Sequence, residues 1–189
     1  MKCLQLKNNL MTNKIIKPNN MNSKIYLLGL VMLFLTSCKK DTPIKVTTDD
    51  FCAAVDTVTG IMVHDIFSPP VASRIYVYPN VAAYEIMAQN NTKYESLQGQ
   101  LKGLDSIPKL DPKSGVNKNL AALIAHIEVS KQLIFSEEAL EKYRDSLYEK
   151  WGSENQKEFD LSKEYALKVV DRIKIWMGKD NYKQTRTFS

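Results

Sequence analysis

The feature that most constrains this chain is a helix-like apolar repeat that runs from about residue 47 to residue 178. Apolar residues recur there every three or four positions, the spacing that places them on one face of an α-helix. No strand-like alternation of apolar and polar residues accompanies it. The sequence therefore predicts an all-α domain of about five helices over residues 47–189.

Local signals mark where these helices begin and end. Ser68 and Pro69 separate a first helix, over about residues 47–67, from a second over about 69–90. The second helix is apolar on nearly all sides, which predicts that it is buried nearly all round. A third helix is expected over about 117–135, with Ser136 as the N-cap of a fourth.

The fifth helix is expected to open at a capping-box pattern formed by Ser153 and Gln156 and to end at Gly178. A glycine- and proline-containing stretch, residues 91–115, separates the second helix from the third. A loop of that length in a compact domain is either functional or wrapped on the surface. Both alternatives stay open from the sequence.

Residues 1–37 are interpreted as a leader and lipoprotein signal peptide, with Met21 as the true start. Lys24 precedes an apolar stretch that is too short to span a bilayer and is typical of a signal-peptide core. The next residues, Leu35-Thr36-Ser37-Cys38, resemble the bacterial lipobox in all four positions. The alternative is an uncleaved apolar helix with a chance cysteine.

The lipobox interpretation predicts lipidation of Cys38 and attachment of the protein to a membrane through it. It also predicts a location in the bacterial cell envelope, outside the cytoplasm. Residues 38–46 are then a polar tether between the lipid and the helical domain.

The net charge of +5 does not indicate a nucleic-acid partner. Residues 1–37 contain five lysines and no acidic residue, which accounts for the whole excess of 26 Lys+Arg over 21 Asp+Glu. The remainder of the chain is balanced in charge, so no nucleic-acid partner is expected.

Few side chains outside the leader suggest chemistry. His64 and His126 lack the spacing of a metal-ligand pair, so neither is expected to bind a metal or act as a general base. Arg74 is either an anion ligand or a structural ion pair, and a pair with Asp65 is the favoured interpretation. Cys52 is expected to be a small packing residue on a helix.

The stretch over residues 63–87 resembles the N-terminal helical part of bacterial lipoproteins in the vanadium-dependent haloperoxidase and phosphatidic acid phosphatase superfamily. Those proteins pair a Pro-Pro-x-Ala-Ser-Arg-x-Tyr-x-Tyr stretch with a downstream Ala-Tyr-Glu. The matching residues are Pro69, Pro70, Ala72, Ser73, Arg74, Tyr76, Tyr78, Ala83, Tyr84 and Glu85. The resemblance covers roughly residues 47–189 and implies the N-terminal part of a longer haloperoxidase- or phosphatase-like domain.

The resemblance implies which catalytic residues such a protein needs. Family members hold phosphate or vanadate with a Lys-x6-Arg-Pro segment, a Pro-Ser-Gly-His turn and a second histidine backed by aspartate. None of these motifs occurs in this chain. No catalytic or metal-ligating residue is therefore assigned, and no cofactor is expected here. Vanadate or phosphate is expected only in a full-length family member.

The resemblance leads to one main hypothesis and one alternative. The chain is the lipid-anchored helical portion of a phosphatase- or haloperoxidase-like protein, inactive without a C-terminal catalytic region. Alternatively, it is a non-catalytic cell-envelope lipoprotein that binds a partner protein or ligand.

Overall fold

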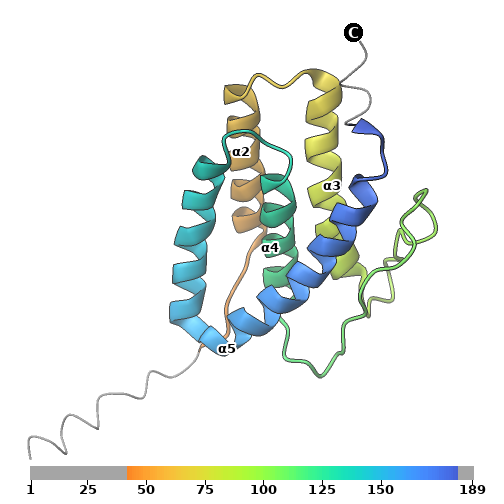
Figure 1. The fold of residues 1–189 in the computed structure, drawn as a ribbon. Coiled ribbons are helices and arrows are strands. Elements are labelled where there is room, and N and C mark those ends of the chain that lie inside the picture. Colours follow the sequence, from red (N-terminus) through yellow and green to blue (C-terminus); the bar gives the residue numbers. More distant parts are fainter. Residues whose placement is uncertain (1–41, 183–189) are drawn as a thin grey trace, which may run out of the picture. The chain divides into compact units, whose positions relative to one another are not determined.

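The computed structural model describes residues 42–182, and these form four helical elements without a strand (Figure 1). The predicted all-α class is confirmed. The leader, Cys38 and the first part of the tether lie outside the described residues, as do residues 183–189. Within the described part, no helix is both long enough and apolar enough to cross a membrane.

The first described helix is α2, Thr48–His64. Thr47 and Asp50 form a reciprocal capping box at its start, with the Asp50 backbone N–H 3.3 Å from Thr47 Oγ1. The helix ends three residues earlier than expected, because Ile66 adopts a left-handed backbone (φ 55°) that stops the helical hydrogen-bond pattern. Cys52 lies on this helix, as predicted, but it is exposed, so the prediction that it is a packing residue was wrong.

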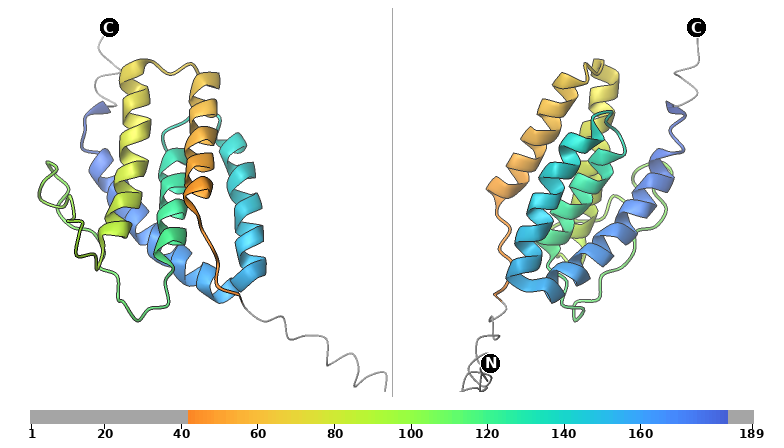
Figure 2. Two further views of the ribbon diagram at one scale, coloured as in Figure 1. Left: turned by 180° about the vertical axis from the view of Figure 1, so that it is seen from behind. Right: turned by 60° about the vertical axis from the view of Figure 1, so that its left-hand side comes forward.

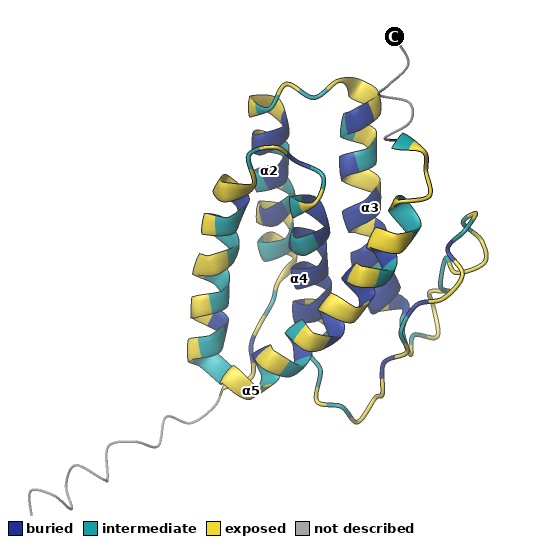
Figure 3. Cartoon of the chain, viewed as in Figure 1, coloured by how far each residue is buried: buried dark blue, intermediate teal, exposed yellow. Residues whose placement is uncertain are grey.

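Helix α3, Pro69–Ala88, begins after Ser68 with proline in its first turn, as the sequence predicted. Ile75, Ala82 and Ile86 are buried in the core. The expectation that α3 is buried nearly all round was wrong, because Val77 is 50% exposed. Figure 3 shows several exposed stretches along α3. One side of an apolar helix is therefore left uncovered by the described residues.

The core is built on α4, Lys118–Lys131, which packs against both α3 and α5. Most of α4 is buried, although its own pattern is only weakly amphipathic, because neighbours cover it on several sides (Figure 3). Asn117 caps its start by accepting a hydrogen bond from the Leu120 backbone N–H.

Helix α5, Glu137–Met177, combines the fourth and fifth expected helices into one kinked element. The prediction of five helices was therefore one too many. The break lies at Asn155, whose backbone is non-helical (φ −158°, ψ 92°), and not at Ser153. Asn155 Oδ1 accepts a hydrogen bond from the Glu158 backbone N–H at 3.1 Å, so asparagine caps the second half. Gly178 ends the helix, as predicted.

The kink directs the second half of α5 across the bundle to a point beside the start of α3 (Figure 1). Side chains of this half also hold the long loop between α3 and α4. Tyr165, Arg172 and Trp176 donate hydrogen bonds to loop carbonyl oxygens at 2.9, 2.7 and 3.0 Å. Loop residues Leu104, Ile107 and Leu110 are buried in the core. The loop is therefore wrapped onto the helices.

Candidate functional site

The basic residue of the 69–85 motif is joined to the end of α5. Arg74 Nε lies 2.5 Å from Asp180 Oδ2, and Arg74 Nη2 donates a hydrogen bond of 3.3 Å to the Met177 carbonyl oxygen. The two charged side chains are only 18% and 24% exposed. Arg74 thus connects the first turns of α3 to the chain just beyond α5.

Aromatic rings surround this ion pair. The Arg74 guanidinium lies 4.3 Å from the ring centroid of Tyr182 and 5.1 Å from that of Tyr78. The Tyr78 hydroxyl donates to Asp180 Oδ2 at 2.8 Å, and its ring meets Trp176 edge to face at 4.9 Å. Burial and the bond to Asp180 together raise the pKa of Tyr78 to about 12.

The charge state of Asp180 follows from its surroundings. Partial burial acts to raise its pKa, but hydrogen bonds from Arg74, the Tyr182 backbone N–H and Tyr78 outweigh it, so the pKa lies below the ordinary value of 3.8. The carboxylate is therefore ionised at neutral pH and accepts from Arg74 Nε, while the Met177 carbonyl oxygen accepts from Nη2. Arg74 acts as a structural ion pair.

The predicted partner of Arg74 was wrong, because Asp65 has a different role. Asp65 accepts hydrogen bonds from the backbone N–H groups of Phe135 and Ser136, at 2.9 and 3.0 Å, and from the Ser136 hydroxyl at 2.5 Å. Ser136 stands at the N-cap position of α5, but its side chain makes no cap bond within its own helix. Asp65 therefore supplies the capping carboxylate from the end of α2.

The acidic residue of the motif, Glu85, is fully buried. Its carboxylate accepts hydrogen bonds from the Ser96 hydroxyl and the Leu97 backbone N–H, both at 2.6 Å. The neighbouring Tyr84 hydroxyl donates to the Glu95 carbonyl oxygen at 2.8 Å. Both side chains hold the start of the long loop against α3.

Another tyrosine of the motif joins α3 to α2. The hydroxyl oxygens of Tyr76 and Thr59 lie 3.0 Å apart, which is hydrogen-bonding distance. With Arg74 bound to the chain beyond α5 and Glu85 bound to the loop, the motif connects α3 to three other parts of the chain. Its residues thus determine how these parts are arranged.

His126 on α4 is buried and does not form part of a catalytic group. It is 3% exposed, its ring lies 5.0 Å from that of Phe51, and its Nδ1 has no hydrogen-bond partner among the described residues. Burial lowers the pKa of His126 to about 4. The imidazole is therefore neutral at neutral pH and serves as a packing group.

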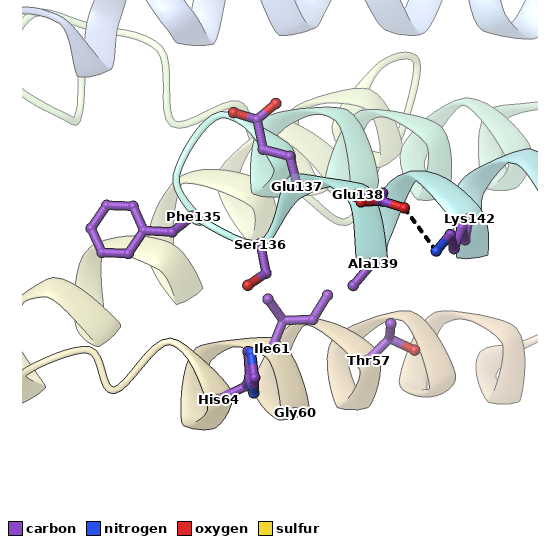
Figure 4. A pocket seen from close by; sticks show the side chains of 10 residues that line it. All are labelled: Thr57, Gly60, Ile61, His64, Phe135, Ser136, Glu137, Glu138, Ala139 and Lys142. Carbon is purple, nitrogen blue, oxygen red and sulfur yellow. Dashed lines mark ion pairs between the residues drawn. The ribbon is translucent and has the colours of Figure 1, made fainter.

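His64 is exposed at a hollow of about 880 Å³ between the end of α2 and the start of α5 (Figure 4). Glu138 in this hollow pairs with Lys142 at 2.8 Å, and Glu137 points away from α2. Neither carboxylate forms a dyad with His64. Across residues 42–182, no three potential metal ligands lie together.

A larger and more apolar hollow lies between α2 and α3, with a volume of about 1090 Å³. Its lining is contributed by α2, α3, α4 and the segments next to them. Its lining includes Lys45, Phe51, Tyr76, Val77, Asn80, Tyr84, Met87 and Ala122.

The pairing of Asp180 and Tyr182 with the motif was not predicted from the sequence. They follow the last helix in a polar stretch, and a pair 106 residues apart leaves no periodic signal. Cys38, the predicted lipidation site, lies outside the described residues.

Comparison with solved structures gives an informative relative. The chain is similar to a bacterial vanadium-dependent iodoperoxidase of known crystal structure, with 56% sequence identity and a TM-score of 0.77. The match covers 79% of this chain but 36% of the iodoperoxidase chain. No protein-family model and no curated protein matches the sequence.

Proposed function

We propose a function from one premise, which is that this chain belongs to the vanadium haloperoxidase superfamily. The proposal is that the chain is the lipid-anchored helical portion of a phosphatidic acid phosphatase- or haloperoxidase-like protein. The match to the iodoperoxidase supports a fragment of that superfamily. We further propose that the chain is catalytically inactive alone. The observation that carries this proposal is the internal use of the motif: Arg74 and Glu85 are bound to Asp180 and to the long loop.

The arginines of the described residues do not converge on a site for a vanadate or phosphate ion. Such an oxyanion needs several cationic donors that converge on one point without competing carboxylates. Arg74 is paired with Asp180, and Arg144 lies 2.9 Å from Asp145 and 3.6 Å from Glu128. Arg172 Nε donates to a loop carbonyl oxygen instead. These three arginines are each occupied at a different place in the fold.

Catalytic inactivity is tested by adding vanadate to the whole chain, following binding by calorimetry, and measuring iodide oxidation with hydrogen peroxide. Hydrolysis of p-nitrophenyl phosphate is measured in parallel. We expect no saturable vanadate binding and no turnover, whereas the full-length iodoperoxidase serves as the positive control. Vanadate binding that disappears in Arg74→Ala would contradict the proposal and would identify Arg74 as an anion ligand.

We also propose that Cys38 is lipidated and holds the protein on a membrane in the bacterial cell envelope. The lipobox spacing supports this, since each buried methylene of an acyl chain contributes about 0.8 kcal/mol to membrane binding. The proposed membrane attachment is through Cys38 alone.

The lipidation site is tested by labelling expressing cells with a palmitate analogue. The wild-type chain and a Cys52→Ala variant should incorporate the label, because Cys52 is an exposed thiol that lies on α2, outside the lipobox. Cys38→Ala should lose both label and membrane fractionation. Label that persists in Cys38→Ala refutes the anchor.

A cell-envelope lipoprotein that binds a separate partner is the second candidate function. The apolar hollow between α2 and α3 favours it, because exposed apolar surface of this kind is typical of binding faces. The two candidates differ in what covers that hollow.

A further inference from the structure

Helix α3 has more apolar surface than the described residues cover. Val77, Asn80, Tyr84 and Met87 follow one another at three- and four-residue spacing and therefore share one face of the helix. Val77 is 50% exposed and Met87 36% exposed. A helix that is apolar on nearly all sides is typical of an element enclosed by neighbours.

This uncovered face forms one wall of the apolar hollow. Phe51 of α2 and Ala122 of α4 also line it. Seen from behind, α2 and α3 stand side by side on this face of the bundle, away from the second half of α5 (Figure 2). Lys45 is the one charged residue among the lining residues of the hollow.

The length of the iodoperoxidase indicates an occupant. This chain matches 36% of it, so most of that protein lies outside the matched region. The two portions of such a protein need a shared, largely apolar surface if they fold together. Among residues 42–182, the α2–α3 face combines a large hollow with exposed apolar side chains from a helix whose composition predicts burial.

We infer that the α2–α3 face is where the remainder of a longer family member packs onto this helical portion. The occupant is an apolar segment that fills the hollow over Val77 and Met87, with an acidic side chain near Lys45. This inference rests on the proposed function, because it takes the chain to be a portion of a longer superfamily protein.

The inference is tested with a chimera in which this chain replaces the matched region of the iodoperoxidase. Val77→Asp is introduced into the chimera and into the isolated chain, and thermal unfolding is measured for both. We expect Val77→Asp to have little effect on the isolated chain, where the side chain already meets water. In the chimera it should lower the Tm by about 4 °C or more, because a charge is then buried without a partner.

Ile175→Asp is the matched control, because Ile175 is a β-branched residue with 53% exposure on α5 and does not line the hollow. It should change the Tm equally in both proteins. A Val77→Asp effect that is also equal in both proteins overturns the inference. So does an isolated chain that forms dimers which Val77→Asp dissociates, since a second copy would then cover the face.

Vanadate binding by the chimera separates failure of the inference from failure of the proposed function. A chimera that unfolds without a cooperative transition, or that binds no vanadate, counts against the proposed function. A chimera that folds and binds vanadate, but in which Val77→Asp behaves like Ile175→Asp, counts against the α2–α3 face alone.

Discussion

At the scale of single residues, the ion pair between Arg74 of the 69–85 motif and Asp180 makes more contacts than any other side chain of the motif. It combines a charge-assisted hydrogen bond with two ring contacts and a bond from Tyr78. Both charges are mostly removed from water, so loss of one leaves the other poorly solvated. This pair should therefore matter more than the exposed ion pairs of α5.

Arg74→Ala should lower the free energy of unfolding by about 1–3 kcal/mol, because it leaves the part-buried Asp180 carboxylate without its cation. Urea unfolding at pH 7 measures this. Lys168→Ala, which removes an exposed i,i+4 pair with Glu164, should cost at most about 0.5 kcal/mol. Equal effects from the two variants would show that Arg74 contributes no more than a surface charge.

The Asp180 contribution should depend on pH in a defined direction. Its folded-state pKa lies below 3.8, so the stabilisation is present above that value and is lost as the pH falls through the folded-state pKa. In Asp180→Asn this acid-side loss should be reduced, as seen by unfolding at a series of pH values from 5 downward. A variant with the wild-type pH profile would contradict the assignment.

His126 should produce a second pH effect, at higher pH. Its folded-state pKa is about 4, against an ordinary value of 6.5, so the unfolded chain binds a proton first as the pH falls. The stability is complete above pH 6.5 and decreases between 6.5 and 4, by at most about 3 kcal/mol.

The variant His126→Leu should remove this slope between pH 6.5 and 4, whereas His64→Leu, at an exposed site, should retain it. Urea unfolding at half-unit pH steps separates the two. A slope that persists in His126→Leu would assign the proton uptake to another group.

At the scale of secondary-structure elements, helix ends are held by side chains from other elements. Asp65, at the end of α2, caps the start of α5, and Lys118 Nζ donates to the Gln89 carbonyl oxygen just beyond α3 at 2.7 Å. A cation near the end of a helix is favoured by the helix dipole, as is a carboxylate near the start. These two helix ends thus depend on partners that are distant in the sequence.

Asp65→Ala should destabilise the start of α5 by about 1 kcal/mol, because two backbone N–H groups lose their acceptor. Hydrogen exchange should show faster exchange at Phe135 and Ser136 than in the wild type. Asp49→Ala, at an exposed position in the first turn of α2, should leave exchange at those two amides unchanged. Unchanged exchange in Asp65→Ala would remove Asp65 from the cap.

At the scale of the whole molecule, the described chain is held at both ends. At the N-terminal end, Ile44 donates its backbone N–H to Glu158 Oε2 at 2.8 Å and accepts a hydrogen bond from Asn117 Nδ2, also at 2.8 Å. Its side chain is buried. Asn117 Nδ2 also lies 3.1 Å from Glu158 Oε1, so the three residues form one connected group.

Glu158→Ala should release the segment around Ile44 and lower the free energy of unfolding by about 1–3 kcal/mol, since two donors lose their acceptor. Limited proteolysis should cut near residues 42–46 faster than in the wild type. Glu154→Ala is the control, because the Glu154 contact to Thr42 is made by the backbone oxygen, which the variant keeps. Equal cleavage of both variants would contradict this role of Glu158.

The sequence was sufficient to predict the all-α class, because apolar periodicity is a local property that neighbours do not alter. It placed the start of α3 and the end of α5 correctly, from proline and glycine. It placed the break in α5 at Ser153, because Ser153 and Gln156 match the capping-box pattern. Asn155, two residues later, is a second residue type that favours the N-cap position. The structure shows that Asn155 makes the cap.

The candidate site was harder to predict than the helices. The sequence indicated Arg74 and Glu85 as charges in need of partners, but it could not identify those partners, because polar pairing depends on which elements meet. Asp65 bonds to residues 70 and 71 positions away, and Arg74 to a residue 106 positions away. The exposed face of α3 was missed for a related reason: composition indicates burial, but not which part of a protein provides it.

The group formed by Ile44, Asn117 and Glu158 has a mechanical consequence. Tension applied to the chain before residue 42 reaches these hydrogen bonds before it reaches the first turn of α2. The load then passes through Asn117 and Glu158 into α4, most of which is buried, and into the second half of α5. A protein tethered at its N-terminus would thus transmit a pull into its core and spare the lightly packed helix that comes first in the sequence.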